Sequence, residues 1–173
     1  MPEDPDAQGQ WLAHAEEELT HMRTVVALYG KAVALVSGRV PEGLALLLVR
    51  LALAGVFWRS GRSKIVEGTW ATISDSTYYL FAEEYNNVPL PSDFAAVMAA
   101  AAEHIFPVLL LFGLFTRGAA LGLLGMTMVI QIFVYPEAWW PVHSLWAALC
   151  LVLIVRGGGL FSADTLIAGR RRS

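Results

Sequence analysis

Four apolar runs dominate the chain, each close to the length that crosses a lipid bilayer. They span residues 42–58, 93–115, 118–135 and 139–155, and strongly polar side chains occur in them only singly or in pairs. A bilayer crossing needs about 20 predominantly apolar residues. Apolar positions do not alternate with a period of two, which argues against a membrane β-barrel. The pattern predicts an all-α integral membrane protein.

Very short connections separate the last three apolar runs, so neighbouring helices are expected to run antiparallel as an up-and-down four-helix bundle. Small residues allow helix backbones to approach closely in lipid. The second and third runs carry many of them, namely Ala95, Ala96, Ala99, Ala100, Ala102, Gly118, Gly122 and Gly125.

The N-terminal region has a different pattern. Residues 1–10 are polar and acidic, which favours disorder. Residues 11–36 have helical periodicity, but their apolar part, from Val25 to Val36, contains Lys31 and is short for a crossing. An amphipathic interfacial helix along the membrane surface is the preferred interpretation, with a fifth crossing as the alternative. Residues 37–41 then break the helix.

The predicted domain plan has three parts. Residues 1–41 form a disordered tail and surface helix, residues 42–167 hold the four crossings, and residues 168–173 form a basic tail. Between the first two crossings, Trp70, Ile73, Thr77, Leu80, Phe81 and Tyr85 recur at helical spacing. This spacing predicts a short amphipathic helix that rests on the lipid headgroups.

Composition supports a lipid environment. Hydrophobic residues make up 56% and charged residues 16% of the chain, against about 25% charged in soluble domains. The net charge of −3 gives no electrostatic reason to bind nucleic acid. The single cysteine, Cys150, cannot form an internal disulfide and is expected to be a buried apolar residue.

Lysine and arginine predict the orientation. With a cytoplasmic N-terminus, the cytoplasmic side holds Arg23, Lys31, Arg39, Arg117, Arg156 and Arg170 to Arg172. The opposite side holds only Arg59, Arg62 and Lys64. We therefore expect both termini to lie in the cytoplasm.

Arg50 and Glu103 are the candidate catalytic and ligand-binding residues. Each lies near the middle of its predicted crossing, where an isolated charge costs about 2.5–3.5 kcal/mol on insertion scales. An intramembrane ion pair between them is expected to offset this cost. The pair either fixes helix register or forms a site for an anionic or quinone-like ligand. Pro107, four residues after Glu103, frees a backbone carbonyl and favours a kink that opens space there.

Three further polar residues are ligand-binding candidates. His104 follows Glu103 directly and points about 100° away from it, so it is expected to face another helix, with Gln131 as a partner. His143 lies near the outer interface among tryptophans. Because the two histidines are at different depths, a shared metal ion is not expected.

Several segments together resemble the DoxX family of small four-helix membrane proteins over residues 43–167. They are Arg50, Phe57, Ser60-Gly61 and Lys64; Glu103, Pro107 and the run 109–117; Gln131 to Pro136 with His143 and Trp146; and Arg156 to Gly159 with Ser162 to Asp164. The resemblance places Arg50, Lys64, Glu103, Arg117 and Asp164 on family-like positions. Arg117 is expected to anchor to headgroups or a helix C-terminus, and Asp164 with Ser162 to cap a short surface helix that reaches Ile167.

The resemblance implies an inner (plasma) membrane protein with a link to redox, sulfur or oxidative-stress metabolism. The preferred hypothesis is therefore a subunit or accessory of a redox-linked membrane process, with a quinone as the possible cofactor and a redox protein or a second copy as partner. Arg50 would orient the ligand's oxygen and Glu103 would exchange a proton. The alternatives are a non-enzymatic membrane scaffold and a small-solute or metal-handling protein.

Overall fold

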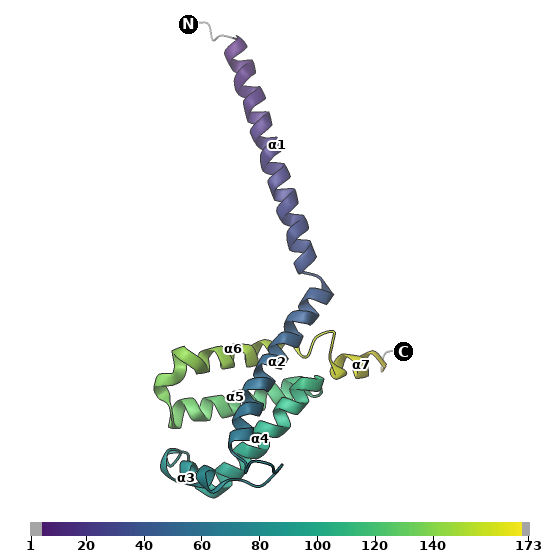
Figure 1. The fold of residues 1–173 in the computed structure, drawn as a ribbon. Helices are drawn as coiled ribbons and strands as arrows, with labels where there is room; N and C mark the ends of the chain where they lie inside the picture. The colour runs from purple at the N-terminus through teal and green to yellow at the C-terminus, as the bar shows by residue number, and fades with distance from the viewer. Residues whose placement is uncertain (1–4, 171–173) are drawn as a thin grey trace. The chain divides into compact units, whose positions relative to one another are not determined.

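The computed structural model describes residues 5–170, and within them the regular elements are helices; Ile65 and Ile73 form one isolated antiparallel bridge. The chain divides into two compact units, residues 1–42 and residues 43–173. Figure 1 shows the elements along the chain.

The first unit is dominated by α1, a single continuous helix from Pro5 to Val36. Every side chain described along it is exposed within the chain. The expectation of disorder over residues 1–10 is wrong for residues 5–10, which are helical, whereas residues 1–4 lie outside the described residues. The chain bends at Ser37 and Gly38, and Pro41 then occupies the first turn of the next helix, where a missing N–H is tolerated.

Within residues 5–170, four helical segments are long and apolar enough to cross a membrane, as the sequence predicts. They are α2 (Arg39–Ser63), α4 (Ser92–Phe112), α5 (Thr116–Phe133) and the segment Pro136–Arg156. The last begins with a 3-10 turn, η1 (Pro136–Ala138), and a π-helical turn, η2 (Trp139–His143), before α6 (Ser144–Arg156). Figure 1 shows α5 and α6 side by side, joined at one end by these turns.

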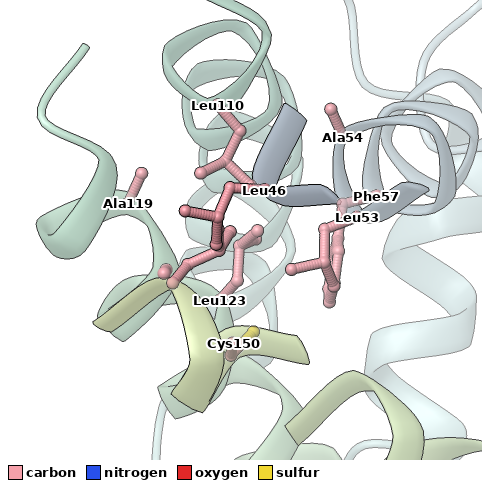
Figure 2. Close-up of a cluster of buried hydrophobic side chains, with 10 residues drawn as sticks. Leu46, Leu53, Ala54, Phe57, Leu110, Ala119, Leu123 and Cys150 are labelled. Atoms are coloured by element: carbon pink, nitrogen blue, oxygen red, sulfur yellow. The ribbon is translucent and has the colours of Figure 1, made fainter. Parts of the chain in front are cut away.

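The spanning helices pack through an apolar core and expose apolar side chains outward. Leu53, Leu110, Leu123 and Cys150, from α2, α4, α5 and α6, are at most 1% exposed and meet in one cluster (Figure 2). The burial of Cys150 confirms its predicted role. Leucines on the outer faces, such as Leu121 at 61% exposed, present the surface expected of helices surrounded by lipid.

The connection between α2 and α4 contains α3 (Asp75–Glu83), which confirms a short helix there. It begins later than the spacing suggests, because the side chain of Ser74 accepts a hydrogen bond from the Thr77 N–H and caps the first turn. Thr77 and Phe81 are buried. Trp70 precedes the helix and lies instead under the guanidinium of Arg62.

A tight turn at Gly113 joins α4 to α5. Gly113 has φ 64°, and the N–H groups of Gly113 and Leu114 donate to Leu110 and Leu109, which is the Schellman arrangement at a helix C-terminus. Near this turn lies α7 (Ala163–Arg170), whose Asp164 N–H donates to the Gly113 carbonyl. We call this end of the spanning helices the α7 end and the opposite one the α3 end.

Candidate functional site

A buried ion pair lies at the α3 end of the spanning helices. The ammonium Nζ of Lys64 is 2.7 Å from Oε2 of Glu103, and the two residues are 8% and 2% exposed. Ser60 lies between them, because its Oγ accepts from Lys64 Nζ at 3.0 Å and donates to Glu103 Oε1 at 3.1 Å. The three side chains therefore form a closed triangle of charge-assisted hydrogen bonds.

The backbone around Lys64 holds this triangle in place. Because α2 continues to Ser63, Ser60 lies one turn before Lys64 on the same side of the helix. The Lys64 carbonyl accepts hydrogen bonds from the Ser74 N–H and the Thr77 hydroxyl at the start of α3. A Cβ on Gly61 would lie 3.0 Å from both Cβ and the carbonyl oxygen of Glu103. A glycine here therefore lets α2 and α4 approach closely enough for the ion pair.

The predicted Arg50–Glu103 ion pair is wrong. Arg50 is fully buried, but its guanidinium donates to the carbonyls of Leu110 and Leu111 at the C-terminus of α4 and to the Phe161 carbonyl. The prediction placed the midpoints of the two crossings at equal depth. The antiparallel register instead aligns Arg50 with Leu110 and Gly61 with Glu103. Along α4, the Arg50 guanidinium therefore lies about two helical turns, or ~10 Å, beyond Glu103, and along α2 Arg50 lies about three turns, or ~16 Å, before Gly61.

Asp164 also has a different role from the one expected. Its two carboxylate oxygens accept from the N–H groups of Phe115 and Thr116, at 2.7 and 2.9 Å, and so cap the start of α5. Ser162 alone caps α7, since its Oγ accepts from the Thr165 N–H. Asp164 also interacts electrostatically with Arg50. These residues stabilise the α7 end of the spanning helices rather than the site at the α3 end.

The histidine partners differ from those expected as well. His104 uses Nδ1 for the Ala100 carbonyl of its own helix, and its ring meets Trp58 edge-on. Gln131 is hydrogen-bonded to His143, at 2.8 Å, and not to His104. The structure therefore brings together Glu103, Gln131 and His143 near the α3 end, and leaves Arg50 away from them. In the described part of the chain, no group of three or more His, Cys, Asp or Glu side chains is placed to hold a metal ion.

Two cavities meet at the Lys64–Glu103 pair. The apolar cavity, about 340 Å³, lies between α3, α4 and α5. Exposed Met98 and Val129 on its lining place its opening on the outer face of the spanning helices. The polar cavity, about 190 Å³, is lined by ten residues. Its polar ones are Ser60, Lys64, Tyr85, Glu103, Tyr135 and His143. Lys64, Glu103 and Tyr85 line both cavities, so a ligand entering the apolar cavity would meet the ion pair at its end.

Two tyrosines, Tyr85 and Tyr135, line the polar cavity as neutral side chains. Tyr85 stacks on Phe81, and burial raises the pKa of Tyr85, with further contributions from the negative charges of Glu103 and Glu84. Its hydroxyl therefore stays a neutral donor. The Tyr135 hydroxyl donates to the Glu84 carboxylate, and this hydrogen bond raises the pKa of Tyr135. Neither phenol contributes a negative charge to the site at neutral pH.

Pro107 lies within the continuous helix α4 and is buried. The space beside it is an apolar groove of about 290 Å³ against α2, lined by Gly55 and Trp58 among others. This groove does not include Glu103, so the space predicted around the carboxylate is provided by the two cavities instead.

Sequence reasoning missed Lys64, Ser60 and Tyr85 as site residues. Lys64 follows the predicted first crossing, residues 42–58, and so falls in the outer connection, and only the family resemblance indicates that it is significant. The sequence did contain one signal: a buried acid such as Glu103 needs a basic partner, and Lys64 is one of the basic residues that closely follow the first crossing. Tyr85 carried no signal beyond its helical spacing with Phe81.

Comparison with known proteins gives a consistent assignment. The sequence model of the DoxX family matches residues 45–136. A Haemophilus influenzae protein described as uncharacterized is 32% identical over 146 aligned positions, which cover 73% of this chain and 85% of the relative. No solved structure matches the chain. Every residue of the Lys64–Glu103–Ser60 triangle falls within the matched range.

Proposed function

This chain belongs to the DoxX family and is a membrane protein, and we propose that it binds a small quinone-like ligand at the Lys64–Glu103 pair. It would do so as a subunit or accessory of a redox-linked membrane process. The observation that carries the proposal is the position of the ion pair, which lies between an apolar cavity open on the outer face of the helices and a polar cavity behind it.

The dimensions and chemistry of the apolar cavity suit such a ligand. Its volume, about 340 Å³, falls in the range of small-molecule sites. Its lining is apolar apart from the residues that meet at its end, chiefly Lys64 and Glu103. A ring with an apolar tail would leave the tail against Met98 and Val129 and direct an oxygen toward the ion pair. Buried charges inside a membrane are costly and mark functional sites.

The roles of the two charged residues follow from their atoms. The Lys64 ammonium would donate to a carbonyl oxygen of the ligand. The Glu103 carboxyl would exchange a proton with the ligand through the Ser60 hydroxyl, which is hydrogen-bonded to both Glu103 and Lys64. Arg50 has no part in this site, because Nη1 and Nη2 of its guanidinium donate to backbone carbonyls at the other end of the helices.

The setting that we propose is the inner membrane. The four spanning helices would form an up-and-down bundle with both termini cytoplasmic, and α1 would lie along the membrane surface as an amphipathic helix. Residues 1–41 would form the N-terminal tail and surface helix, residues 42–167 the domain of four crossings, and residues 168–173 a basic tail. A redox protein or a second copy of the chain would be the partner.

Binding of a quinone to the purified protein tests the proposal. In lipid nanodiscs, wild-type protein should bind duroquinone, and Lys64→Met with Glu103→Leu together should abolish binding. Breaking a buried pair by removing one partner costs about 3–5 kcal/mol, whereas removing both charges is often neutral for folding. The double variant should therefore stay folded, which circular dichroism and thermal unfolding would verify.

A pair of leucine substitutions provides a matched control. Ala102→Leu fills the apolar cavity beside Glu103 and should weaken quinone binding at least tenfold, whereas Gly55→Leu fills the separate groove beside Pro107 and should leave it unchanged. Binding that survives in the double charge variant contradicts the proposed site. In that case the ion pair only fixes helix register, as a membrane scaffold would require.

A further inference from the structure

The neighbouring residues determine which ring nitrogen of His143 carries the proton. His143 Nδ1 lies 2.8 Å from the side-chain oxygen of Gln131, and the amide nitrogen of Gln131 donates to the Pro136 carbonyl at 2.7 Å. The carbonyl can only accept a hydrogen bond, so the Gln131 amide nitrogen must face it and the amide oxygen must face His143. An oxygen facing Nδ1 requires a proton on Nδ1. The neutral ring therefore has a lone pair on Nε2.

That lone pair has no partner among the residues described. His143 is 4% exposed, its ring lines the polar cavity, and Nε2 makes no hydrogen bond in the described part of the chain. The chain bends into this position through the π-helical turn η2, which ends at His143. Such turns are frequent at functional sites. Among the described residues, Nε2 of His143 is not one of the fully enclosed side-chain atoms that lack a partner, so it is accessible from the cavity, where a water or a ligand can satisfy it.

The other polar groups around the cavity are donors or are already paired. Lys64 has only N–H donors; two are directed to Glu103 and to Ser60 Oγ, and the third makes only a long contact, 3.4 Å, to the Ser60 carbonyl, from which a ligand oxygen can displace it. The Ser60 hydroxyl is engaged between Lys64 and Glu103, and the Tyr85 hydroxyl is a further donor on the lining. The Tyr135 hydroxyl is directed to Glu84. The polar cavity thus presents an ammonium donor and an imidazole acceptor to the same small volume, about 190 Å³. A hydroxyl group satisfies both, since its oxygen accepts from Lys64 while its proton is donated to His143 Nε2.

We propose that the polar cavity selects a ligand with an aromatic hydroxyl, such as a hydroquinone, over the corresponding quinone, with His143 Nε2 as the acceptor of the hydroxyl proton and Gln131 as the residue that positions it. This inference rests on the proposed function and names the form of the ligand that the site prefers. A quinone carbonyl could accept from Lys64 but would leave Nε2 without a donor.

Paired binding measurements test the preference. Durohydroquinone and duroquinone differ by two hydrogens on a ring of nearly the same size, and both can be titrated anaerobically into protein in nanodiscs. Wild-type protein should bind the hydroquinone about fivefold more tightly, which is the size of one net hydrogen bond. His143→Phe keeps a ring but removes the acceptor, and should bring the affinity ratio to about one by weakening hydroquinone binding about fivefold.

A spectroscopic measurement on the folded protein is independent of any variant's stability. In protein labelled with ¹⁵N-histidine, the His143 resonances, assigned by their loss in His143→Phe, should report a protonated Nδ1 and an unprotonated Nε2. Durohydroquinone should shift the Nε2 resonance and duroquinone should not. Gln131→Leu removes the fixed partner of Nδ1, and should produce a mixture of tautomers and a smaller preference.

The outcomes separate the two proposals. Failure of both probes to bind refutes the ligand site, and with it this preference. Equal binding of both probes, unchanged in His143→Phe, refutes the preference alone and leaves the Lys64–Glu103 site standing. A proton found on Nε2 in the ligand-free protein also overturns the inference.

Discussion

At the scale of single residues, Arg50 and Gly113 depend on each other. The guanidinium of Arg50 reaches the last carbonyls of α4 because Gly113 leaves room for it. A Cβ on Gly113 would lie 2.2 Å from Nη1 of Arg50. The glycine also has φ 64°, a conformation that residues with a side chain adopt only with strain.

Gly113→Ala should therefore destabilise the protein by about 2–4 kcal/mol, from the strained backbone and the forced displacement of a buried charged side chain. The measurement is the free energy of unfolding in detergent micelles. Gly125→Ala is the matched control, because nothing lies within 4 Å of its Cβ position in α5. It should be neutral or up to ~1 kcal/mol stabilising. Equal stability of the two variants would contradict the role of Gly113.

The sequence predicts which residues are buried polar residues better than it predicts their partners. Charge and position within an apolar run are enough to select Arg50 and Glu103. Pairing them needs the relative register of two helices, and the partner that Glu103 finds, Lys64, comes about four helical turns after Arg50. Register is set by contacts such as that of Gly61 against the Glu103 backbone, which no periodicity reveals.

At the scale of elements, the turn between α4 and α5 is stabilised by Asp164, a residue that comes much later in the sequence. Asp164 follows α6 and lies in the first turn of α7, yet its carboxylate accepts from the first N–H groups of α5. A helix N-terminus has unsatisfied N–H donors and a positive end of the helix dipole, so a carboxylate there is doubly favourable. Asp164 therefore holds α7 against the start of α5.

Asp164→Ala should reduce the free energy of unfolding by about 1–3 kcal/mol, since it removes a cap with charge-assisted hydrogen bonds. It should also expose α7 to limited proteolysis while the core remains resistant. Glu67→Ala is a suitable control, because Glu67 is an exposed acid in the connection between α2 and α3, outside any helix. A change of less than about 0.5 kcal/mol in this control is expected. A similarly small effect of Asp164→Ala would show that the cap is not needed.

The existence of the elements follows from the sequence, but some of their ends do not. Apolar length alone predicts the four crossings. The end of α2 was placed too early because Ser60 and Gly61 are usual helix-ending residues, yet here they serve the ion pair and the close approach to α4. The start of α3 depends on the Ser74 cap, a local hydrogen bond that outweighs the helical spacing of Trp70. Local capping and tertiary packing therefore decide the boundaries.

At the scale of the whole molecule, the structure strengthens the charge asymmetry that predicts orientation. Lys64 is buried in its ion pair and so no longer counts as an outer surface charge. Of the described residues in the second unit, Arg59 and Arg62 then remain as basic surface residues at the α3 end, whereas Arg117, Arg156 and Arg170 lie at the α7 end. Positively charged flanks are retained in the cytoplasm during insertion. The α3 end, with the ligand site, should therefore face away from the cytoplasm.

Single cysteines introduced at the two ends test this orientation. Ala82→Cys lies on the exposed side of α3 and Ala168→Cys on the exposed side of α7. The natural Cys150 is fully buried and should give little background. A membrane-impermeant maleimide should label Ala82→Cys in intact cells, and Ala168→Cys only after permeabilisation. The reverse pattern would place the Lys64–Glu103 site near the cytoplasmic surface, so a redox partner would then have to approach it from the cytoplasm.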